Sequence, residues 1–255
     1  MRRRHILVAM GALLLPRPAL AEPLYAVELI PGAHDGGRWQ AGIRIGMEPG
    51  WKTYWRMPGD AGIPPSFDWT GSQNVAEITA LFPAPSRFED QGGEAVGYKS
   101  AVLFPVMITP ADAAQPVTLS LNLFFAVCKD VCIPAKANPA LTLTPGASAS
   151  ESFGLIASAL ASVPKPGSAI TSATAVMVDQ KPALAIALAG DLPPDLDIFV
   201  EGGGLAYFRA PRLSQPQHYV LPVTGITGLN ELKGQTLTIT IVGSGLALEQ
   251  TVTVG

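Results

Sequence analysis

The chain has 255 residues, of which 48% are apolar and 15% are charged, and it contains 26 glycines and 24 prolines. This composition is typical of short strands joined by many turns, and it argues against a disordered chain or a helical bundle. After residue 21 there remain 13 basic and 20 acidic residues, a net charge near −7, which argues against nucleic acid as a partner.

The first 21 residues have the pattern of a secretory signal. Three arginines precede an apolar run over residues 6–15, and Ala19-Leu20-Ala21 supplies the small residues that a signal peptidase accepts. The run is too short to span a bilayer as a helix, and no later stretch reaches about 18 consecutive apolar residues. An uncleaved anchor is the alternative, but Arg17 and Pro18 interrupt the segment. We therefore expect residues 1–21 to be cleaved and the mature chain, without a transmembrane segment, to lie in an oxidising space.

Period-2 alternation of apolar and polar residues predicts strands along most of the chain, separated by Pro-Gly, Gly-Gly and Gly-Asp turns. The predicted strands cover residues 39–45, 101–109, 117–127, 140–144, 183–189, 197–200, 219–223, 235–242 and 247–254. One helix interrupts them. Ser150 can cap this helix, Glu151 lies in its first turn, and Pro164 ends it. Its apolar face is formed by Phe153, Ile156, Leu160 and Val163.

The helix and the following Pro164-Lys165-Pro166-Gly167 predict a domain boundary. We expect a signal at 1–21, a first domain at 22–147, a helix and linker at 148–168, and a second β-sandwich at 169–255. The second half contains no cysteine and a single histidine, His218. We interpret it as a docking or spacing module without a catalytic group.

Cys128 and Cys132 are the two cysteines of the chain, and three residues separate them. A disulfide needs Cα atoms about 4.4–6.8 Å apart, whereas four steps along an extended strand cover roughly 13 Å. The chain must therefore turn between them. A hairpin with Lys129-Asp130-Val131 as its loop would make the cysteines cross-strand partners about 4.5–5.5 Å apart. One turn of helix is the alternative, but the strand-rich sequence before the pair and Pro134 after it favour the hairpin.

Alternation indicates which face of the sheet the pair occupies. One face of residues 117–127 is continuously apolar (Val117, Leu119, Leu121, Leu123, Phe125 and Val127), and Cys128 falls on the other, more polar face. We therefore expect the pair to lie near the surface, where another sulfur can reach it for thiol–disulfide exchange. Lys129 would favour a thiolate and Asp130 would oppose it, so the sequence does not decide which cysteine attacks.

Other roles for these residues stay open. The pair could be an inert disulfide in a secreted structural adaptor, or two thiolates that bind Cu(I) as soft ligands.

Phe124, an aromatic residue on the polar face, either shields the pair or packs under a loop for stability alone. Tryptophans 51, 55 and 69 are better explained by core packing than by docking. The three histidines are scattered and no phosphate-binding loop is present, so we expect no cofactor, zinc site or hydrolase chemistry.

Four segments carry a family resemblance and occur in the order expected for that family: WKTYWRMPGDAG at 51–62, FPAPSRF at 82–88, VLFPV at 102–106 and VCKDVCIP at 127–134. They resemble the N-terminal periplasmic domain of DsbD-type thiol:disulfide interchange proteins, and most closely the ScsB-like branch of copper-sensitivity suppressors. The resemblance extends over residues 24–145. Three residues separate the cysteines here, where the best-known members have five.

The resemblance implies an immunoglobulin-like sandwich for the first domain. Together with the helix, the linker and the strands that follow, this leads us to expect an all-β protein of two immunoglobulin-like β-sandwich domains joined by a short helix and a Pro/Gly linker. It implies a protein-disulfide reductase component of the periplasm, with Cys128 and Cys132 taking electrons from a membrane-embedded thiol reductase on another polypeptide. Thioredoxin-like or other oxidised proteins would be the clients, in settings such as cytochrome c biogenesis or copper tolerance. It also implies a loop that covers the disulfide, here residues 87–93, with Phe88 as the covering side chain and glycines as a hinge.

Overall fold

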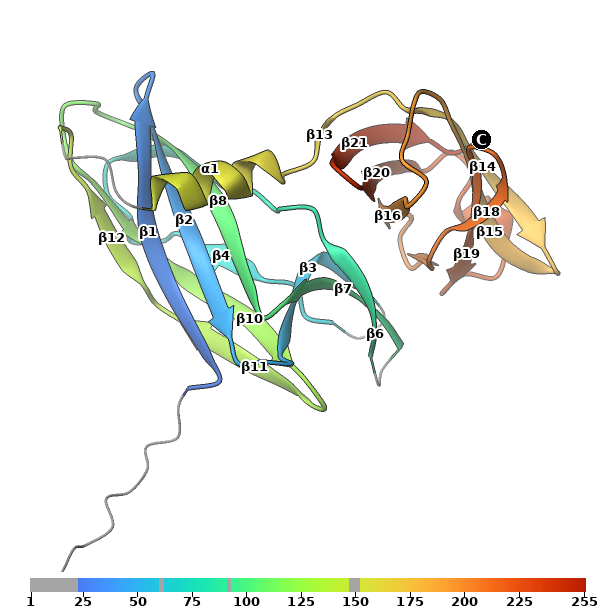
Figure 1. Ribbon diagram of the computed structural model, residues 1–255, viewed down its shortest axis with the longest axis horizontal. Helices are drawn as coiled ribbons and strands as arrows, with labels where there is room; N and C mark the ends of the chain where they lie inside the picture. The colour runs from blue at the N-terminus through green and yellow to red at the C-terminus, as the bar shows by residue number, and fades with distance from the viewer. Residues whose placement is uncertain (1–22, 60–61, 91–92, 147–151) are drawn as a thin grey trace, which may run out of the picture.

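The computed structural model describes residues 23–59, 62–90, 93–146 and 152–255, which form two β-sandwiches (Figure 1). The predicted all-β class with two immunoglobulin-like domains is confirmed. The predicted signal, as well as Ser150 and Glu151 of the predicted helix, lies outside the described residues. Within them, no helix is both long and apolar enough to cross a membrane.

The first sandwich packs two main sheets against each other. One sheet has the order β1 (Tyr25–Asp35), β2 (Arg38–Met47), β8 (Ala101–Pro110) and β5 (Val75–Ala80). The other has the order β11 (Cys132–Ala137), β10 (Asn122–Cys128), β3 (Lys52–Gly59), β7 (Gly93–Lys99) and β6 (Ser86–Asp90), and β4 (Ser66–Asp68) also pairs with β10. A two-stranded ribbon of β9 (Val117–Ser120) and β12 (Ala140–Leu143) completes this half.

Alternation locates the core of the first sandwich correctly. All six residues of the predicted apolar face of 117–127 are buried, with at most 2% of their surface exposed. The predicted strand is divided at Leu121, because its first part pairs with β12 and its second part with β11 and β4. Trp55 is fully buried, and Trp51 and Trp69 pack against the same core, as the core-packing interpretation predicts.

The predicted helix is present as α1 (Phe153–Ala161), which lies across the β1, β2 and β8 sheet (Figure 1). Ile156 is its one fully buried side chain. Glycines make room for it, because a Cβ at Gly32 would lie 2.8 Å from the Ile156 Cδ1 atom. Phe153, on the predicted apolar face, is instead 46% exposed.

The second sandwich also consists of two sheets. One is β13 (Lys165–Pro166), β21 (Leu246–Thr253), β20 (Thr236–Gly243) and β16 (Asp197–Glu201). The other is β14 (Ile170–Val178), β15 (Lys181–Leu188), β19 (His218–Thr224) and β17 (Tyr207–Phe208), with β18 (Arg212–Gln215) also paired to β19. A short 3-10 helix, η1 (Leu229–Glu231), precedes β20. Each predicted strand of this half is found, with bounds shifted by one or two residues.

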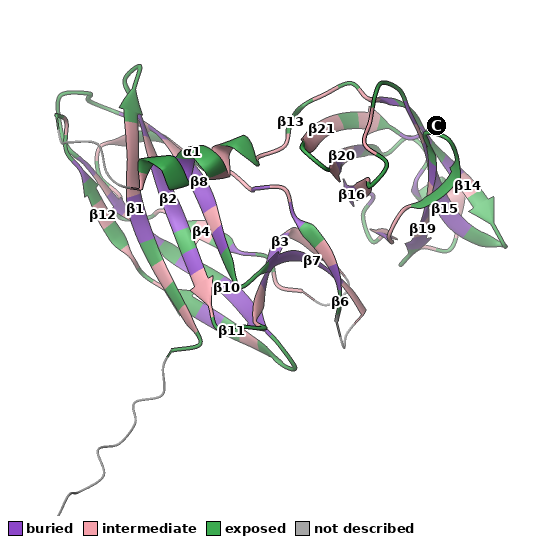
Figure 2. Ribbon diagram, viewed as in Figure 1, coloured by how far each residue is buried: buried purple, intermediate pink, exposed green. Residues whose placement is uncertain are grey.

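The two sandwiches meet where β3, β6 and β7 of the first contact β16, β17 and β21 of the second (Figures 1 and 2). Phe199 of β16 is 1% exposed and belongs to the core of the first sandwich, where its ring meets Trp55 edge-on at 5.7 Å. Arg56 of β3 donates to both carboxylate oxygens of Glu201, at 2.9 and 2.8 Å, and also contacts Glu249. Apolar packing and ion pairs therefore join the two halves.

Candidate functional site

The cysteine pair closes the end of the β10–β11 hairpin. Cys128 and Cys132 are cross-strand partners in the ladder and form a disulfide, with their Cα atoms 4.2 Å apart. Lys129-Asp130-Val131 forms the loop, and the Lys129 amide donates to the Val131 carbonyl at 3.2 Å. The predicted hairpin is confirmed, and the alternative of a helical turn is wrong.

The two cysteines differ in burial. Cys128 is fully buried, whereas Cys132 is exposed. Cys128 lies on the face opposite the main core, as predicted, but the expectation that it lies near the surface is wrong. That face is open near Asn122 but covered at Ala126 and Cys128, because another part of the sheet folds over it. Cys132 is therefore the member of the pair that has surface open to solvent.

The covering element is the β6–β7 hairpin, together with Tyr54 of β3. Phe88 of β6 and Ala95 of β7 are cross-strand partners and form a small buried cluster with Tyr54, Ala126 and Cys128. Ile63 packs against the edge of this cluster. Residues 87–93, expected as a loop, thus contribute strands on either side of Gln91 and Gly92, which lie outside the described residues. The structure brings Phe88, 7% exposed, to Cys128.

Phe124, the other predicted shielding residue, has a different environment. Its cross-strand neighbours are Ser66 on β4 and Lys136 on β11. It is 37% exposed and is not a member of the buried cluster around Cys128. Of the two aromatic candidates, Phe88 is therefore the one that packs in a buried cluster with a cysteine.

Tyr54 is the site residue that sequence reasoning missed. Its hydroxyl donates to the Cys128 Sγ atom at 2.9 Å and lies 3.1 Å from the Cys132 Sγ atom. The neighbouring Thr53 hydroxyl donates to the Ala126 carbonyl at 2.8 Å, which fixes β3 against β10. Tyr54 and Cys128 are 74 positions apart, so no local pattern connects them. The one available signal was that Tyr54 lies in a segment of family resemblance.

Two lysine side chains lie near the Phe88 ring. The Lys52 and Lys99 ammonium groups lie 5.2 and 5.3 Å from the centre of the Phe88 ring. Lys52 is also the cross-strand partner of Cys128.

With the disulfide formed, the two cysteines do not offer thiolates to a metal ion. Across the residues that the structure describes, no group of three or more histidine, cysteine or acidic side chains could hold a metal. The Cu(I) alternative needs both thiolates of Cys128 and Cys132, and here their sulfurs are bonded to each other. His218 is exposed on the second sandwich, where its Nδ1 atom lies 2.9 Å from the Pro216 carbonyl.

A two-sandwich protein with a half-covered disulfide at a hairpin end is the arrangement that the sequence resemblance predicted. The model of the family "Thiol:disulfide interchange protein DsbD, N-terminal" matches residues 21–144. That part of the chain is therefore similar to DsbD-type N-terminal domains, as the sequence resemblance implied. A second family model, a domain of unknown function (DUF8393), matches residues 162–255.

Among solved structures, the chain is similar to the N-terminal periplasmic domain of ScsB from Proteus mirabilis. The two share 23% sequence identity with a TM-score of 0.72, over 94% of this chain and 96% of the other. The likeness shows that both sandwiches have a counterpart in that fold. No functionally curated protein matches the sequence.

Proposed function

We propose that Cys128 and Cys132 are a redox-active pair that exchanges electrons with other proteins by thiol–disulfide exchange. The observation that carries the proposal is the asymmetry of the disulfide: Cys132 is exposed, Cys128 is buried, and one tyrosine hydroxyl contacts both sulfurs. Exchange requires a sulfur that a thiolate can approach and a leaving sulfur that the protein can stabilise. The family of residues 21–144 supports the same chemistry.

Reduction of the pair would begin at Cys132. A donor thiolate attacks the Cys132 Sγ atom, a mixed disulfide forms, and the bond to Cys128 breaks to leave a thiolate there. The Tyr54 hydroxyl is placed to donate to this leaving thiolate. A second donor thiolate then attacks the donor sulfur of the mixed disulfide and releases Cys132. Two electrons have moved to the pair, which is left as two thiolates, and the donor has become a disulfide. The two protons released when the donor thiols ionised are balanced by protons that the new thiolates take up from water.

Reduction of a client would run the same steps in reverse. The Cys132 thiolate attacks a client disulfide, one client sulfur leaves as a thiolate, and a mixed disulfide joins the two proteins. Cys128, held opposite Cys132 by the ladder, attacks the Cys132 sulfur and expels the second client thiolate. Cys132 is thus the attacking residue and Cys128 the resolving residue.

We propose that this exchange takes place in the periplasm, after removal of residues 1–21. The electron donor would be a membrane-embedded thiol reductase, and the clients would be thioredoxin-like or other oxidised proteins of cytochrome c biogenesis or copper tolerance. Residues 22–147 would form the redox domain, residues 148–168 the helix and linker, and residues 169–255 the second sandwich.

A redox titration in glutathione buffers tests the proposal against an inert disulfide. An exchanger should equilibrate at a potential between about −270 and −120 mV, the range of thiol oxidoreductases, whereas structural disulfides of secreted proteins lie below about −300 mV. Failure to equilibrate in this range would contradict the proposal.

Single-cysteine variants test the assigned roles. Cys128→Ser leaves the exposed Cys132 and should form a stable mixed disulfide rapidly with oxidised glutathione. Cys132→Ser leaves the buried Cys128 and should react much more slowly, because the cluster around Phe88 covers it. Equal rates for the two variants would contradict the assignment of Cys132 as the attacking residue.

A further inference from the structure

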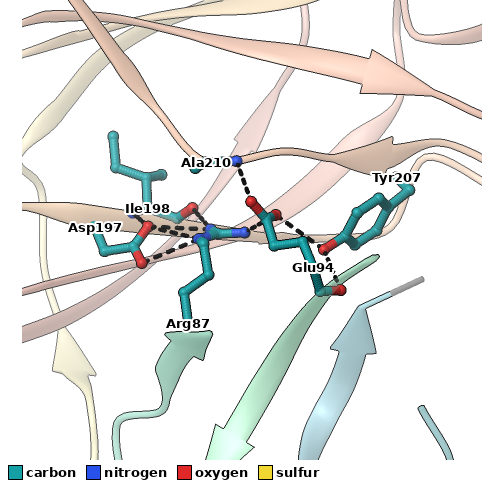
Figure 3. A network of polar contacts seen from close by, with 6 residues as sticks. All are labelled: Arg87, Glu94, Asp197, Ile198, Tyr207 and Ala210. Atoms are coloured by element: carbon teal, nitrogen blue, oxygen red, sulfur yellow. Dashed lines mark hydrogen bonds and ion pairs between the residues drawn. The ribbon is translucent and has the colours of Figure 1, made fainter. Parts of the chain in front are cut away.

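The β6–β7 hairpin that covers Cys128 has two faces with different partners. Neighbouring residues of a strand point to opposite sides of a sheet, and cross-strand partners share a side. Phe88 and Ala95 are partners and face the disulfide. Arg87 and Glu94 lie on the opposite face, which contacts the second sandwich (Figure 3). The same short hairpin therefore connects the redox site to the C-terminal half of the chain.

Arg87 forms one end of this connection. Its Nε atom donates to both carboxylate oxygens of Asp197, at 3.2 and 3.1 Å, and its Nη2 atom donates to Asp197 at 3.0 Å and to the Ile198 carbonyl at 2.9 Å (Figure 3). The side chain is 10% exposed and also contacts Glu94. Burial opposes its charge, but the hydrogen bonds and charge of Asp197, together with the charges of Glu94 and Tyr207, outweigh burial and raise the pKa of the guanidinium. Arg87 thus stays charged and bound to β16.

Glu94 forms the other end. The Tyr207 hydroxyl donates to Glu94 Oε1 at 3.1 Å, and the backbone amide of Ala210 donates to Oε2 at 3.2 Å. The two sandwiches pack closely against each other around Glu94. Gly59 of β3 has a φ of +96°, and a Cβ there would lie 2.4 Å from the Glu94 carbonyl and 3.2 Å from the Tyr207 hydroxyl.

The sheet alone anchors this hairpin weakly. Among the residues that the structure describes, β6 is an edge strand and pairs with β7 alone. The β3–β7 ladder is regular from Lys52 to Tyr54, then irregular until the single pair Gly59 and Ala95. The part of the hairpin that carries Phe88 therefore lies beyond the regular ladder. Its position depends on side-chain contacts, which the second sandwich supplies on one face.

We propose that the second sandwich holds the β6–β7 hairpin closed over Cys128, with Asp197 and Tyr207 as positioning residues. This inference deepens the proposed function and assigns a role to the half of the chain that contains neither cysteine. Opening the hairpin exposes the buried cysteine, and it requires the contacts of Arg87 and Glu94 with the second sandwich to break. A partner that separates the two sandwiches would therefore also uncover the resolving cysteine.

The reactivity of Cys128 measures this cover directly. In a full-length Cys132→Ser protein, Cys128 is the single thiol, and its thiolate attacks the disulfide of 5,5′-dithiobis(2-nitrobenzoate). A mixed disulfide forms, and one coloured thiolate is released per cysteine. We expect Asp197→Ala and Tyr207→Phe, made in this background, each to speed the reaction by at least about fivefold, the lower end of typical coupling between sites. Asp197→Glu, which keeps the carboxylate, should restore most of the protection.

Two control variants separate positioning from other effects. Glu28→Gln removes an exposed carboxylate that pairs with Arg44 at 2.9 Å on the β1–β2 edge, away from the hairpin. Ile156→Ala destabilises the first sandwich at α1 without touching the network. Neither control should raise the labelling rate of Cys128 as much as Asp197→Ala or Tyr207→Phe does. Circular dichroism should show that all variants are folded.

The inference is overturned if Asp197→Ala and Tyr207→Phe leave the labelling rate of Cys128 unchanged, or if Ile156→Ala raises it equally. Labelling depends on the cover over one cysteine and does not require exchange with a protein. The result is thus independent of the redox titration that tests the proposed function.

Discussion

Removal of the Tyr54 hydroxyl should make the disulfide harder to reduce. Tyr54→Phe keeps the ring in the buried cluster but removes the donor that lies 2.9 and 3.1 Å from the two sulfurs. A hydrogen bond to a charged group contributes about 1.5–3 kcal/mol, against about 0.5–1.5 for a neutral pair. The hydroxyl therefore favours the reduced, thiolate-containing state over the disulfide by about 1–2 kcal/mol, and its loss should lower the reduction potential by about 20–40 mV.

The measurement is a glutathione titration of both proteins at pH 7, with the reduced fraction determined by alkylation and mass spectrometry. Tyr98→Phe is the matched control. Tyr98 is also buried, but its hydroxyl donates to the Pro83 carbonyl at 2.8 Å rather than to sulfur. Burial raises the pKa of Tyr98 well above its ordinary value of 10.0, so it is a neutral donor throughout the titration.

The reasoning would be refuted if Tyr54→Phe had the potential of the parent protein. It would also be refuted if Tyr98→Phe shifted the potential by the same amount, because the effect would then follow from a lost buried hydroxyl in general.

Three further changes have expected outcomes. Phe88→Ala should cost about 3–5 kcal/mol in the free energy of unfolding and speed labelling of Cys128, because a buried ring is lost over that sulfur. Ile156→Ala should cost about 2–5 kcal/mol in urea unfolding, because the side chain that docks α1 is fully buried. Glu231→Gln should lower the melting temperature at pH 7. Hydrogen bonds from the backbone amides of residues 227 and 228 lower the pKa of Glu231 below its ordinary 4.5, so the carboxylate stabilises the fold above that pH and this stability is lost as the pH falls through the lowered pKa.

Each change has its own check. Phe124→Ala is the control for Phe88→Ala, and it should have a small effect on both readouts because Phe124 is 37% exposed. A variant at Ile156 with parent stability would contradict the docking role of α1. For Glu231→Gln, the two melting curves should converge in acid, and a constant difference between pH 7 and pH 3 would contradict the titration argument.

The sequence was sufficient for part of the strands and for the geometry of the cysteine pair. Strands β1, β3, β5, β6, β7 and β14 were not among the predicted ranges. Alternation is a local property, and the inward side of 117–127 followed from it without knowledge of the other strands. The hairpin followed from the short distance that a disulfide allows between Cα atoms. Both predictions depend on residues close together in the chain.

The cover over the pair was not predictable in the same way. Whether Cys128 is exposed depends on β3, β6 and β7, which are distant in sequence, and the polar face is open at one end and covered at the other. Arg87 and Asp197 are 110 positions apart, and an ion pair between two surface-type residues leaves no periodic pattern. The resemblance pointed to Phe88, but no sequence pattern connects Tyr54 or the second sandwich with the cysteine pair.

The ladder between β10 and β11 has a consequence for the lifetime of covalent complexes. The ladder runs from Leu123 to the loop, and its backbone pairing holds Cys128 opposite Cys132 in addition to the sulfur–sulfur bond. After reduction, the two thiols therefore remain at high effective concentration, and an intramolecular attack is favoured over a second encounter. Adducts of the native protein should dissociate quickly and leave little time for a wrong partner to be captured.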